Sequence, residues 1–332
     1  ALNLERTGRH PVELVIDCTG FRSLLLGQEM GEPFISYDEF LLNDRACAVQ
    51  IPHIEGQPLQ PYTTSTALTA GWAWNVPLYH RIGTGYVYSS KFKSDDEAKQ
   101  ELMRHLGDRA AGLEPRTLQM RIGRMRRSWV KNVVGIGLSG GFIEPLESTA
   151  IYMIEVANRQ LIGFWPDSDF PDAVLNQYNK VMMTLQDEVR DFIVLHYRLN
   201  NRSEPYWVAA RKELPTPDSL REDFERWRLT LPNDRDHPEA QLFPASSNQM
   251  CLFGKGFYDV DSPRAAQPDI VARPELSLET FASPLEWSQF SEYLLAQKKR
   301  LVAGLPDHRA LVTSIRGAVS TGGAGGDVAA ML

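Results

Sequence analysis

The sequence predicts an α/β fold with an α+β tendency, in which a mixed sheet is followed by a mainly helical part. Two observations support this prediction. An apolar strand, a glycine-rich loop and an apolar helix follow one another without a break from Trp129 to Phe164, and beyond Pro166 the chain becomes helical and proline-punctuated. We therefore expect a sheet-containing domain over residues 1–165, a helical subdomain over 166–319 and a flexible, glycine-rich tail over 320–332.

The strand and loop around Gly135 organise the rest of the chain. Val130, Val133 and Val134 form a short β-branched run, and Gly135, Gly137 and Gly140 make a G-x-G-x-x-G pattern. In the dinucleotide-binding fingerprint the helix opens inside this pattern, whereas here the residues FIEP intervene first. The spacing therefore argues against an ordinary dinucleotide-binding turn.

A helix is expected to begin near Thr149 and to run without Gly or Pro to Leu161. The first backbone N–H groups of a helix lack acceptors and lie at the positive end of its dipole, so this N-terminus is a candidate anion site. Glu147 would share that pocket with the amides of Thr149 and Ala150. The alternative interpretation is that Glu147 and the neighbouring serine merely cap the helix.

Composition limits the class of protein. A chain of 332 residues with a net charge of -7 argues against general nucleic-acid or acidic-membrane binding, and 43% hydrophobic residues without a run of about 18 apolar residues predict a soluble protein. The three cysteines are far apart and form no C-x-x-C, so neither a metal site nor a disulfide framework is predicted. With no secretory signal at its start, the chain is expected in the cytoplasm.

The elements on either side follow from local patterns. Between Leu68 and Phe92 the aromatic residues alternate with period two around a polar turn, which predicts paired antiparallel strands with one aromatic face. Ser94 and Glu97 make a capping box for a helix that should stop at Gly107. A basic cluster before the organising strand could face a phosphate group or be solvated, and the solvated interpretation is favoured; its members are Arg121, Arg124, Arg126, Arg127 and Lys131.

Apolar residues recur at three- and four-residue steps from Val174 to His196, which predicts a long amphipathic helix. His196 lies on its apolar face, where a lone histidine is usually a satisfied core residue. Further helices are expected from Asp218 to Thr230 and from Leu285 to Ala303.

Three motifs in order resemble those of the flavin-dependent halogenases, in particular the tryptophan halogenase-like family. Residues 142–150, FIEPLESTA, resemble F-x-x-P-x-x-S-x-G, with Ala150 where the family has glycine. Residues 72–77, WAWNVP, resemble W-x-W-x-I-P, and residues 83–90, GTGYVYSS, fit a third family strand. Residues 17–20, DCTG, are similar to a strand end that closes the FAD-binding sheet of flavin monooxygenases.

The resemblance assigns expected roles to individual residues. Glu147 would be the catalytic base, and the backbone amides of Thr149 and Ala150 would bind the halide. The expected cofactor-binding residues are Asp17, Gly20, Gly135, Gly137 and Leu138, and the expected substrate-binding residues are Trp72, Trp74, Pro77, His196 and Tyr197. The family's first βαβ unit and its catalytic lysine have no counterpart here, so we expect this chain to be the C-terminal portion of a longer enzyme.

The implied reaction is FADH2-dependent chlorination or bromination of an electron-rich aromatic compound with O2, and a flavin reductase supplies the FADH2. Family members that act on free tryptophan carry N-Y-Y-C, whereas this chain has Asn248-Gln249-Met250-Cys251. Because Gln and Met cannot replace two phenolic hydroxyls, an indole-like substrate other than free tryptophan is favoured. The alternatives are a flavin monooxygenase without halide use and a noncatalytic interaction domain. Besides the reductase and the aromatic substrate, a homodimer partner is also considered.

Overall fold

The computed structural model describes the chain except for residues 167–168, 238–241, 259–283 and 321–332. Its strands are β1 Leu2–Leu4, β2 Gly8–His10, β3 Val15–Asp17, β4 Phe34–Ser36, β5 Arg45–Ile51, β6 Thr64–Leu68, β7 Gly71–Pro77, β8 Ile82–Tyr88, β9 Arg116–Gln119, β10 Gly123–Met125, β11 Trp129–Val130, β12 Val133–Gly135 and β13 Gly141–Phe142. Its α-helices are α1 Asp95–Leu106, α2 Ala150–Gly163, α3 Asp172–Arg198, α4 Pro205–Lys212, α5 Asp218–Trp227, α6 Ala245–Gly254, α8 Pro284–Gly304 and α9 His308–Ser320. The short helices are η1 Gly20–Arg22, η2 Leu24–Glu29, η3 Gly107–Ala110, η4 Gly137–Ser139 and η5 Pro145–Glu147.

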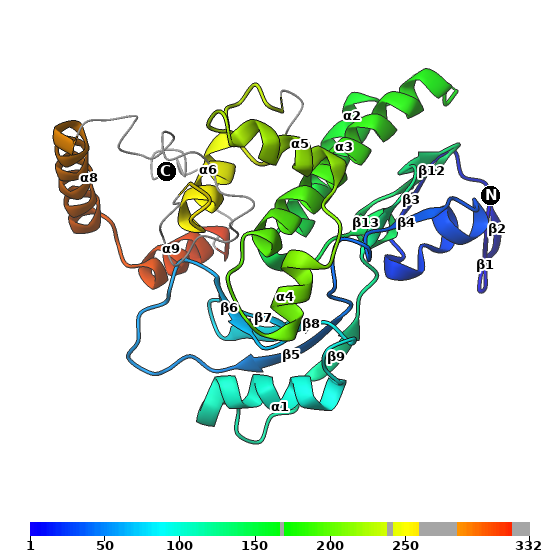
Figure 1. The fold of residues 1–332 in the computed structure, drawn as a ribbon. Helices are drawn as coiled ribbons and strands as arrows, with labels where there is room; N and C mark the ends of the chain where they lie inside the picture. The colour runs from blue at the N-terminus through cyan, green and yellow to red at the C-terminus, as the bar shows by residue number, and fades with distance from the viewer. Residues whose placement is uncertain (167–168, 238–241, 259–283, 321–332) are drawn as a thin grey trace.

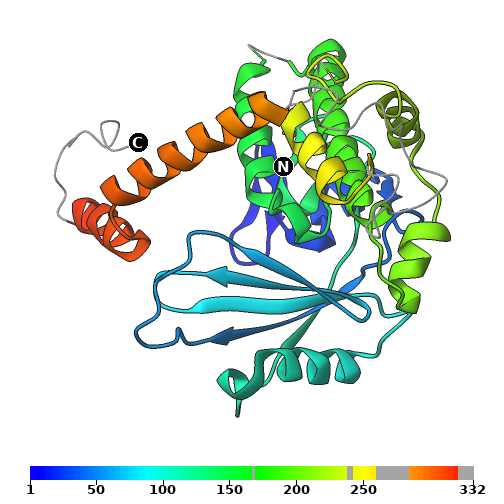
Figure 2. The same ribbon diagram turned by 60° about the vertical axis from the view of Figure 1, so that its left-hand side comes forward.

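A five-stranded antiparallel sheet in the order β6-β7-β8-β5-β9 forms one layer of the molecule (Figure 1). Helix α1 lies against one face of this sheet and the other helices lie over the opposite face (Figure 2). Ala98 and Leu102 of α1 pack on the first face, and Phe192 and Val189 of α3 belong to the core on the second. The sheet is therefore buried on both sides, and α3 is the helix that connects it to the rest of the fold.

The register of the β7–β8 hairpin places its aromatic residues on two different faces. Trp72 pairs with Val87, and Ala73 pairs with Tyr86. Because residues directly opposite each other in a sheet share a face, the tryptophans face α3 while Tyr86 and Tyr88 face α1. The antiparallel pair is confirmed, but the prediction of a single aromatic face is wrong: alternation within each strand does not fix the register between them.

The organising segment forms a small mixed sheet. Strand β12 pairs in parallel with β3 and antiparallel with β11, and a third sheet has the order β13-β10-β4. These pairings confirm the predicted mixed sheet of an α/β fold. The strand expected around Asp17 is short because the chain turns at Gly20, which has a φ of +75° that favours glycine.

Helix α3 joins the two parts that the sequence predicts. It spans Asp172–Arg198 and confirms the predicted long amphipathic helix. The Asn179 amide donates to the Trp129 carbonyl oxygen at 2.8 Å and accepts from the Trp129 N–H at 2.7 Å, and the Tyr178 ring packs edge-on against the Trp129 ring. The proposed boundary near residue 165 therefore runs through a shared core and stays a prediction.

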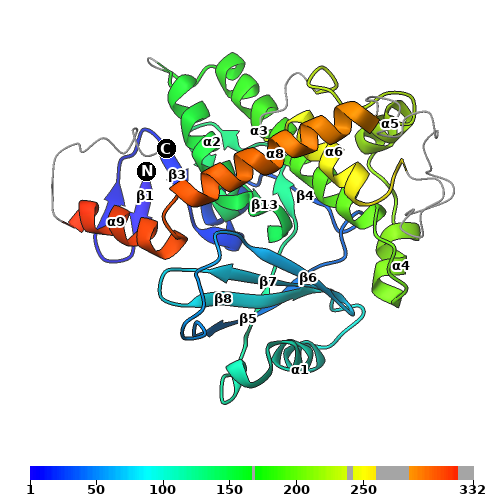
Figure 3. The same cartoon turned by 90° about the vertical axis from the view of Figure 1, so that its left-hand side faces the viewer.

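The C-terminal helices extend away from this core. Figure 1 shows α8 and α9 at one side of the molecule, and in Figure 3, which faces that side, α8 runs across the front. Helix α9 reaches the β7–β8 turn, where Arg309 Nη1 donates to the Tyr79 carbonyl oxygen at 3.1 Å. The predicted tail falls almost entirely in residues 321–332, outside the described part. Within the described part, no helix combines the length and the apolar character that a membrane span requires.

Candidate functional site

The segment from Phe142 to Ala150 carries the candidate catalytic carboxylate. Pro145 opens the short helix η5, which ends at Glu147, and Ser148 then adopts the left-handed conformation with a φ of 55°. Helix α2 starts immediately afterwards, with Thr149 at its N-cap position and Ala150 as its first residue. The left-handed residue separates the two helices, so Glu147 is held at the mouth of α2 without being part of it.

Glu147 forms an ion pair with His196 on α3. The Glu147 Oε1 lies 3.0 Å from the His196 Nε2, and the Nδ1 of the same ring lies 2.8 Å from the Phe192 carbonyl oxygen. Both ring nitrogens thus face acceptors, so each must carry a proton and the ring is an imidazolium. Burial lowers the pKa of His196, but its hydrogen bonds to Cys251, 3.5 Å away, and to Glu147 outweigh burial and raise that pKa to about 10.

This geometry bears on the alternative roles of Glu147 and His196. No side chain makes a capping hydrogen bond at the Thr149 N-cap of α2, and the Glu147 side chain reaches His196 instead. The helix-cap interpretation of Glu147 therefore finds no support among the described contacts. His196 is largely buried, with 17% of its side chain exposed, and its partner is the candidate base itself.

A second carboxylate, Glu144, lies three residues before the first and was missed by sequence reasoning. It is completely buried and accepts hydrogen bonds from Asn43 Nδ2 at 2.7 Å, from Trp72 Nε1 at 3.3 Å and from the Tyr197 hydroxyl. Burial raises the pKa of Glu144, and the three donors offset only part of that effect, so its pKa is about 7. A polar residue inside the apolar run before Pro145 was the available signal.

The predicted substrate residues occupy different positions. Trp72 and Tyr197 are buried, with 3% and 4% exposed, and both donate to Glu144. Trp74 is partly buried on the same face of β7, with its ring centroid 6.3 Å from that of Trp72. Pro77 lies at the opposite end of β7 from Gly71 and pairs with Ile82, so the structure does not bring it near Glu144. Of the three predicted substrate residues on β7, Trp74 is thus the one that lies close to Trp72 and is still partly accessible.

Four of the predicted halide and flavin residues meet at a small cavity, which Thr149, Asp17 and Gly20 do not line. Gly135, Gly137, Leu138 and Ala150 line a space of about 60 Å³ between the glycine loop and the start of α2. The loop is tightly packed, since a Cβ on Gly135 would lie 2.5 Å from Leu26 Cδ2. A cavity of this size suits a small ion or water, whereas ligand pockets usually span about 300–1,000 Å³. The described lining of this cavity therefore leaves no room for a molecule as large as FAD.

Asp17 and Gly20 hold the neighbouring loop in place. The buried Asp17 carboxylate accepts from the Thr19 hydroxyl at 2.6 Å and from the backbone N–H groups of Thr19, Leu25 and Leu26, each at 2.9 Å. These bonds, that of the Thr19 hydroxyl first, outweigh burial and lower the pKa of Asp17. The Gly20 carbonyl oxygen accepts from Ser23 N at 2.9 Å. Within the described residues, both oxygens of Asp17 already accept hydrogen bonds from the protein. Asp17 would therefore shape the strand end beside a cofactor and not bind the cofactor directly.

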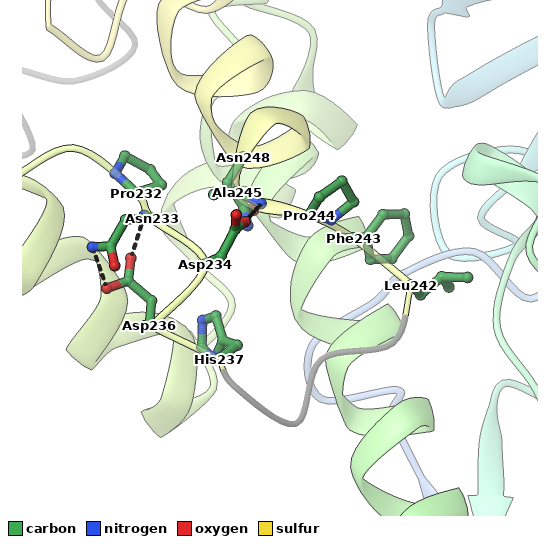
Figure 4. Close-up of a pocket in the computed structure, with 10 residues that line it drawn as sticks. All are labelled: Pro232, Asn233, Asp234, Asp236, His237, Leu242, Phe243, Pro244, Ala245 and Asn248. Carbon is green, nitrogen blue, oxygen red and sulfur yellow. Dashed lines mark hydrogen bonds between the residues drawn. The ribbon is translucent and has the colours of Figure 1, made fainter.

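Two cavities lie on the α5–α6 side of α3. One of 310 Å³ is bounded by the loop after α5 and by Asn248 of α6 (Figure 4). The other, of 480 Å³, shares Phe243 and Asn248 with it and is also lined by Phe192. The Phe192 ring packs against the His196 ring with centroids 5.0 Å apart, so Phe192 lies between the larger cavity, which it lines, and His196, which does not line it.

Comparison with known proteins defines the family. A model of the family described as "Tryptophan halogenase" matches residues 1–273 of this chain. The chain belongs to the tryptophan halogenase family. Its relatives include the tryptophan 6-halogenase SttH of Streptomyces toxytricini, which is 42% identical over 263 residues, 78% of this chain and 50% of SttH.

Solved structures of the family confirm the mixed α/β fold with a helical part. The crystal structure of SttH superposes with a TM-score of 0.81 at 37% identity, covering 91% of this chain and 57% of SttH. BrvH, a flavin-dependent halogenase from Brevundimonas sp. BAL3, gives a TM-score of 0.77 at 35% identity, covering 93% and 60%. The chain thus spans about half the length of the curated halogenases it matches.

Proposed function

We propose that this chain forms the halide- and substrate-side part of a flavin-dependent halogenase that acts on an indole-like aromatic compound. One observation carries the proposal. The Glu147 carboxylate lies at the mouth of α2, inside the F-x-x-P-x-x-S motif, and it is paired with an imidazolium at 3.0 Å. Family membership supports the same role.

The residues of this chain would bind the halide before it is oxidised and act on the aromatic substrate afterwards. FADH2 and O2, with a flavin reductase as the source of FADH2, would supply the oxidising equivalents that convert a halide into an electrophilic halogen. Ala150, the first residue of α2, lines the 60 Å³ cavity, and its amide together with that of the N-cap residue Thr149 would hold the halide at this helix start. Ala150 still provides its N–H, although its methyl group occupies space that a glycine would leave open.

Glu147 would act on the aromatic substrate as an orienting group and general base. A halogenated aromatic cation is a strong acid, so even a carboxylate that an imidazolium stabilises is basic enough to remove its proton. His196 would direct the Glu147 side chain, which is 33% exposed and therefore accessible. Trp74 would provide a flat contact for the ring, because it is the less buried of the two tryptophans.

The substrate is proposed to be indole-like and without the amino-acid group of free tryptophan. Gln249 donates to the Pro232 carbonyl oxygen at 2.7 Å, and Met250 is 74% exposed, so neither position offers a hydroxyl to an amino-acid substrate. The relatives named as tryptophan halogenases favour the competing substrate, free tryptophan. Competition between indole and tryptophan in one reaction separates these two proposals.

The decisive experiment measures products by mass spectrometry. The native polypeptide that contains this chain is incubated with FAD, a flavin reductase, NADH, bromide and an aromatic library that includes indole and tryptophan. Brominated indole is the expected product, and it should disappear in Glu147→Gln while flavin binding persists. Hydroxylated products would instead indicate a monooxygenase, and the absence of any product would favour a noncatalytic domain. Homodimer formation and a cytoplasmic location stay predictions.

A further inference from the structure

The buried network around Glu144 connects three parts of the fold that the proposed chemistry needs. Asn43 precedes β5, Trp72 lies on β7 and Tyr197 lies on α3, and all three donate to the same carboxyl group. Glu144 itself belongs to the segment that carries Glu147. The carboxyl group is therefore the point at which the sheet, the long helix and the catalytic segment are joined.

The hydrogen bonds leave no freedom in this arrangement. Asn43 Nδ2 also donates to the Tyr197 hydroxyl oxygen at 2.8 Å, and Asn43 Oδ1 accepts from the Tyr206 hydroxyl at 2.9 Å. The two N–H groups of Asn43 thus have one acceptor each, Glu144 and Tyr197, and its oxygen has a donor, which fixes the orientation of the amide. A buried network whose members are all satisfied is rigid, whereas losing one member leaves the others unpaired in a medium of low dielectric.

Adjacent residues of α3 bind the two carboxylates in parallel. Tyr197 binds Glu144, and His196 binds Glu147 at 3.0 Å. We propose that Glu144 is a positioning residue, which anchors the segment before α2 to Trp72 and Tyr197 and thereby places the Glu147 carboxylate on His196 and beside the tryptophan strand. This inference rests on the proposed function for its consequence in catalysis, but the anchoring itself can be tested without turnover.

The test follows the titration of the His196 ring by NMR in the chain as it exists. His196→Gln identifies the signal. In Glu144→Gln the new amide N–H group faces the Asn43 amide N–H group, so the anchor opens, Glu147 moves off His196, and the midpoint should fall by at least about 1 pH unit. The double variant Glu144→Gln with Asn43→Asp exchanges the amide and the carboxylate, which restores the donor–acceptor pair between these two positions, although position 43 then no longer donates to the Tyr197 hydroxyl. The restored pair should close the anchor and return the midpoint to the wild-type value.

A matched control separates positioning from general loss of stability. Asn179 is also a buried amide on α3, but it binds the backbone of Trp129. Asn179→Leu should lower the melting temperature without moving the His196 midpoint. In the native protein that carries halogenase activity, Glu144→Gln should lower kcat on the order of a hundredfold with little change in KM, as for a misplaced catalytic group.

The outcomes distinguish the two proposals. An unchanged His196 midpoint in Glu144→Gln, or a double variant that behaves like the single one, overturns the positioning role whether or not the protein halogenates. The third outcome is a His196 midpoint that shifts in the single variant and returns in the double variant, in a protein that does not halogenate. This outcome supports the positioning role of Glu144 and rejects only the proposed function. If the single variant does not fold, the double variant decides, because a folded double variant with a displaced midpoint contradicts the proposal.

Discussion

The charge on His196 makes the stability of the fold depend on pH. Its pKa is raised from 6.5 to about 10, chiefly because Cys251 and Glu147 outweigh burial. The stabilisation is therefore complete below pH 6.5 and is lost as the pH rises toward 10. We expect Glu147→Gln to weaken this dependence, since the contacts of His196 with Cys251 and Phe192 remain, as measured by urea unfolding at pH 6, 8 and 10. Glu155→Gln, which affects an exposed α2 carboxylate 3.9 Å from Arg159, is the control and should keep the wild-type slope.

Glu144 predicts a second loss of stability with rising pH, in a more acidic window than that of His196. Its pKa rises from 4.5 in the unfolded chain to about 7 in the fold, because burial outweighs its hydrogen bonds, so the folded state binds the proton more tightly. Stability from this group is lost as the pH rises from 4.5 to 7, by on the order of 3 kcal/mol. Urea unfolding of Glu144→Gln across this range should lack that decline. A variant that retains it would show that another group titrates there.

Sequence reasoning reached one of the two carboxylates. Glu147 and His196 could be chosen because they belong to motifs, and the structure brings them together. Glu144 and Asn43 lie 101 residues apart and meet only through the tertiary fold, so no local pattern connects them. The interpretation of the basic cluster as solvated is wrong for Arg124, which is 8% exposed and binds Asp187 at 3.0 Å.

At the level of elements, the β7–β8 hairpin depends on a glycine that the sequence marks only as part of a motif. A Cβ on Gly85 would lie 2.2 Å from the Trp74 ring and 2.6 Å from the Cys47 carbonyl oxygen, whereas one on Gly83 would find its nearest neighbour at 4.0 Å. Gly85→Ala should therefore destabilise the protein by about 1–3 kcal/mol. Gly83→Ala should have little effect. Thermal unfolding of both variants tests this, and equal melting temperatures would show that the Trp74 ring moves aside freely.

Helix positions were predicted better than strand faces. The capping box of α1 forms as expected, with Ser94 and Glu97 bonded reciprocally, because all of its information is local. The faces of β7 and β8 depend on which residues pair across the turn, and that choice is made by packing on both layers. The start of α2 also agrees with the sequence, although the left-handed Ser148 before it was not predicted.

At the level of the whole molecule, the shared core predicts that residues 1–165 cannot fold alone. Trp129 is completely buried, and its partners Tyr178 and Asn179 lie beyond residue 165. A chain ending at residue 165 should lose near-ultraviolet circular dichroism and NMR dispersion because this core stays open. A chain ending at residue 258, which keeps α3 to α6, is the control. A well-dispersed spectrum from the shorter chain would establish the boundary near 165 as a true domain limit.

Helix α3 contacts the rest of the fold at several positions along its length, so the spacing between these positions matters for the structure. Asn179 is hydrogen-bonded to the Trp129 backbone, and Asp187 forms an ion pair with Arg124. Near the end of the helix, His196 pairs with Glu147 and Tyr197 donates to Glu144. One inserted residue between Asp187 and His196 would rotate everything after it by about 100° and shift it by about 1.5 Å, detaching both glutamates at once. An insertion of seven residues, about two turns, would restore the direction but displace both contacts by about 10 Å. The number of residues between these contact positions on α3 therefore matters as much as the identity of the residues that make the contacts.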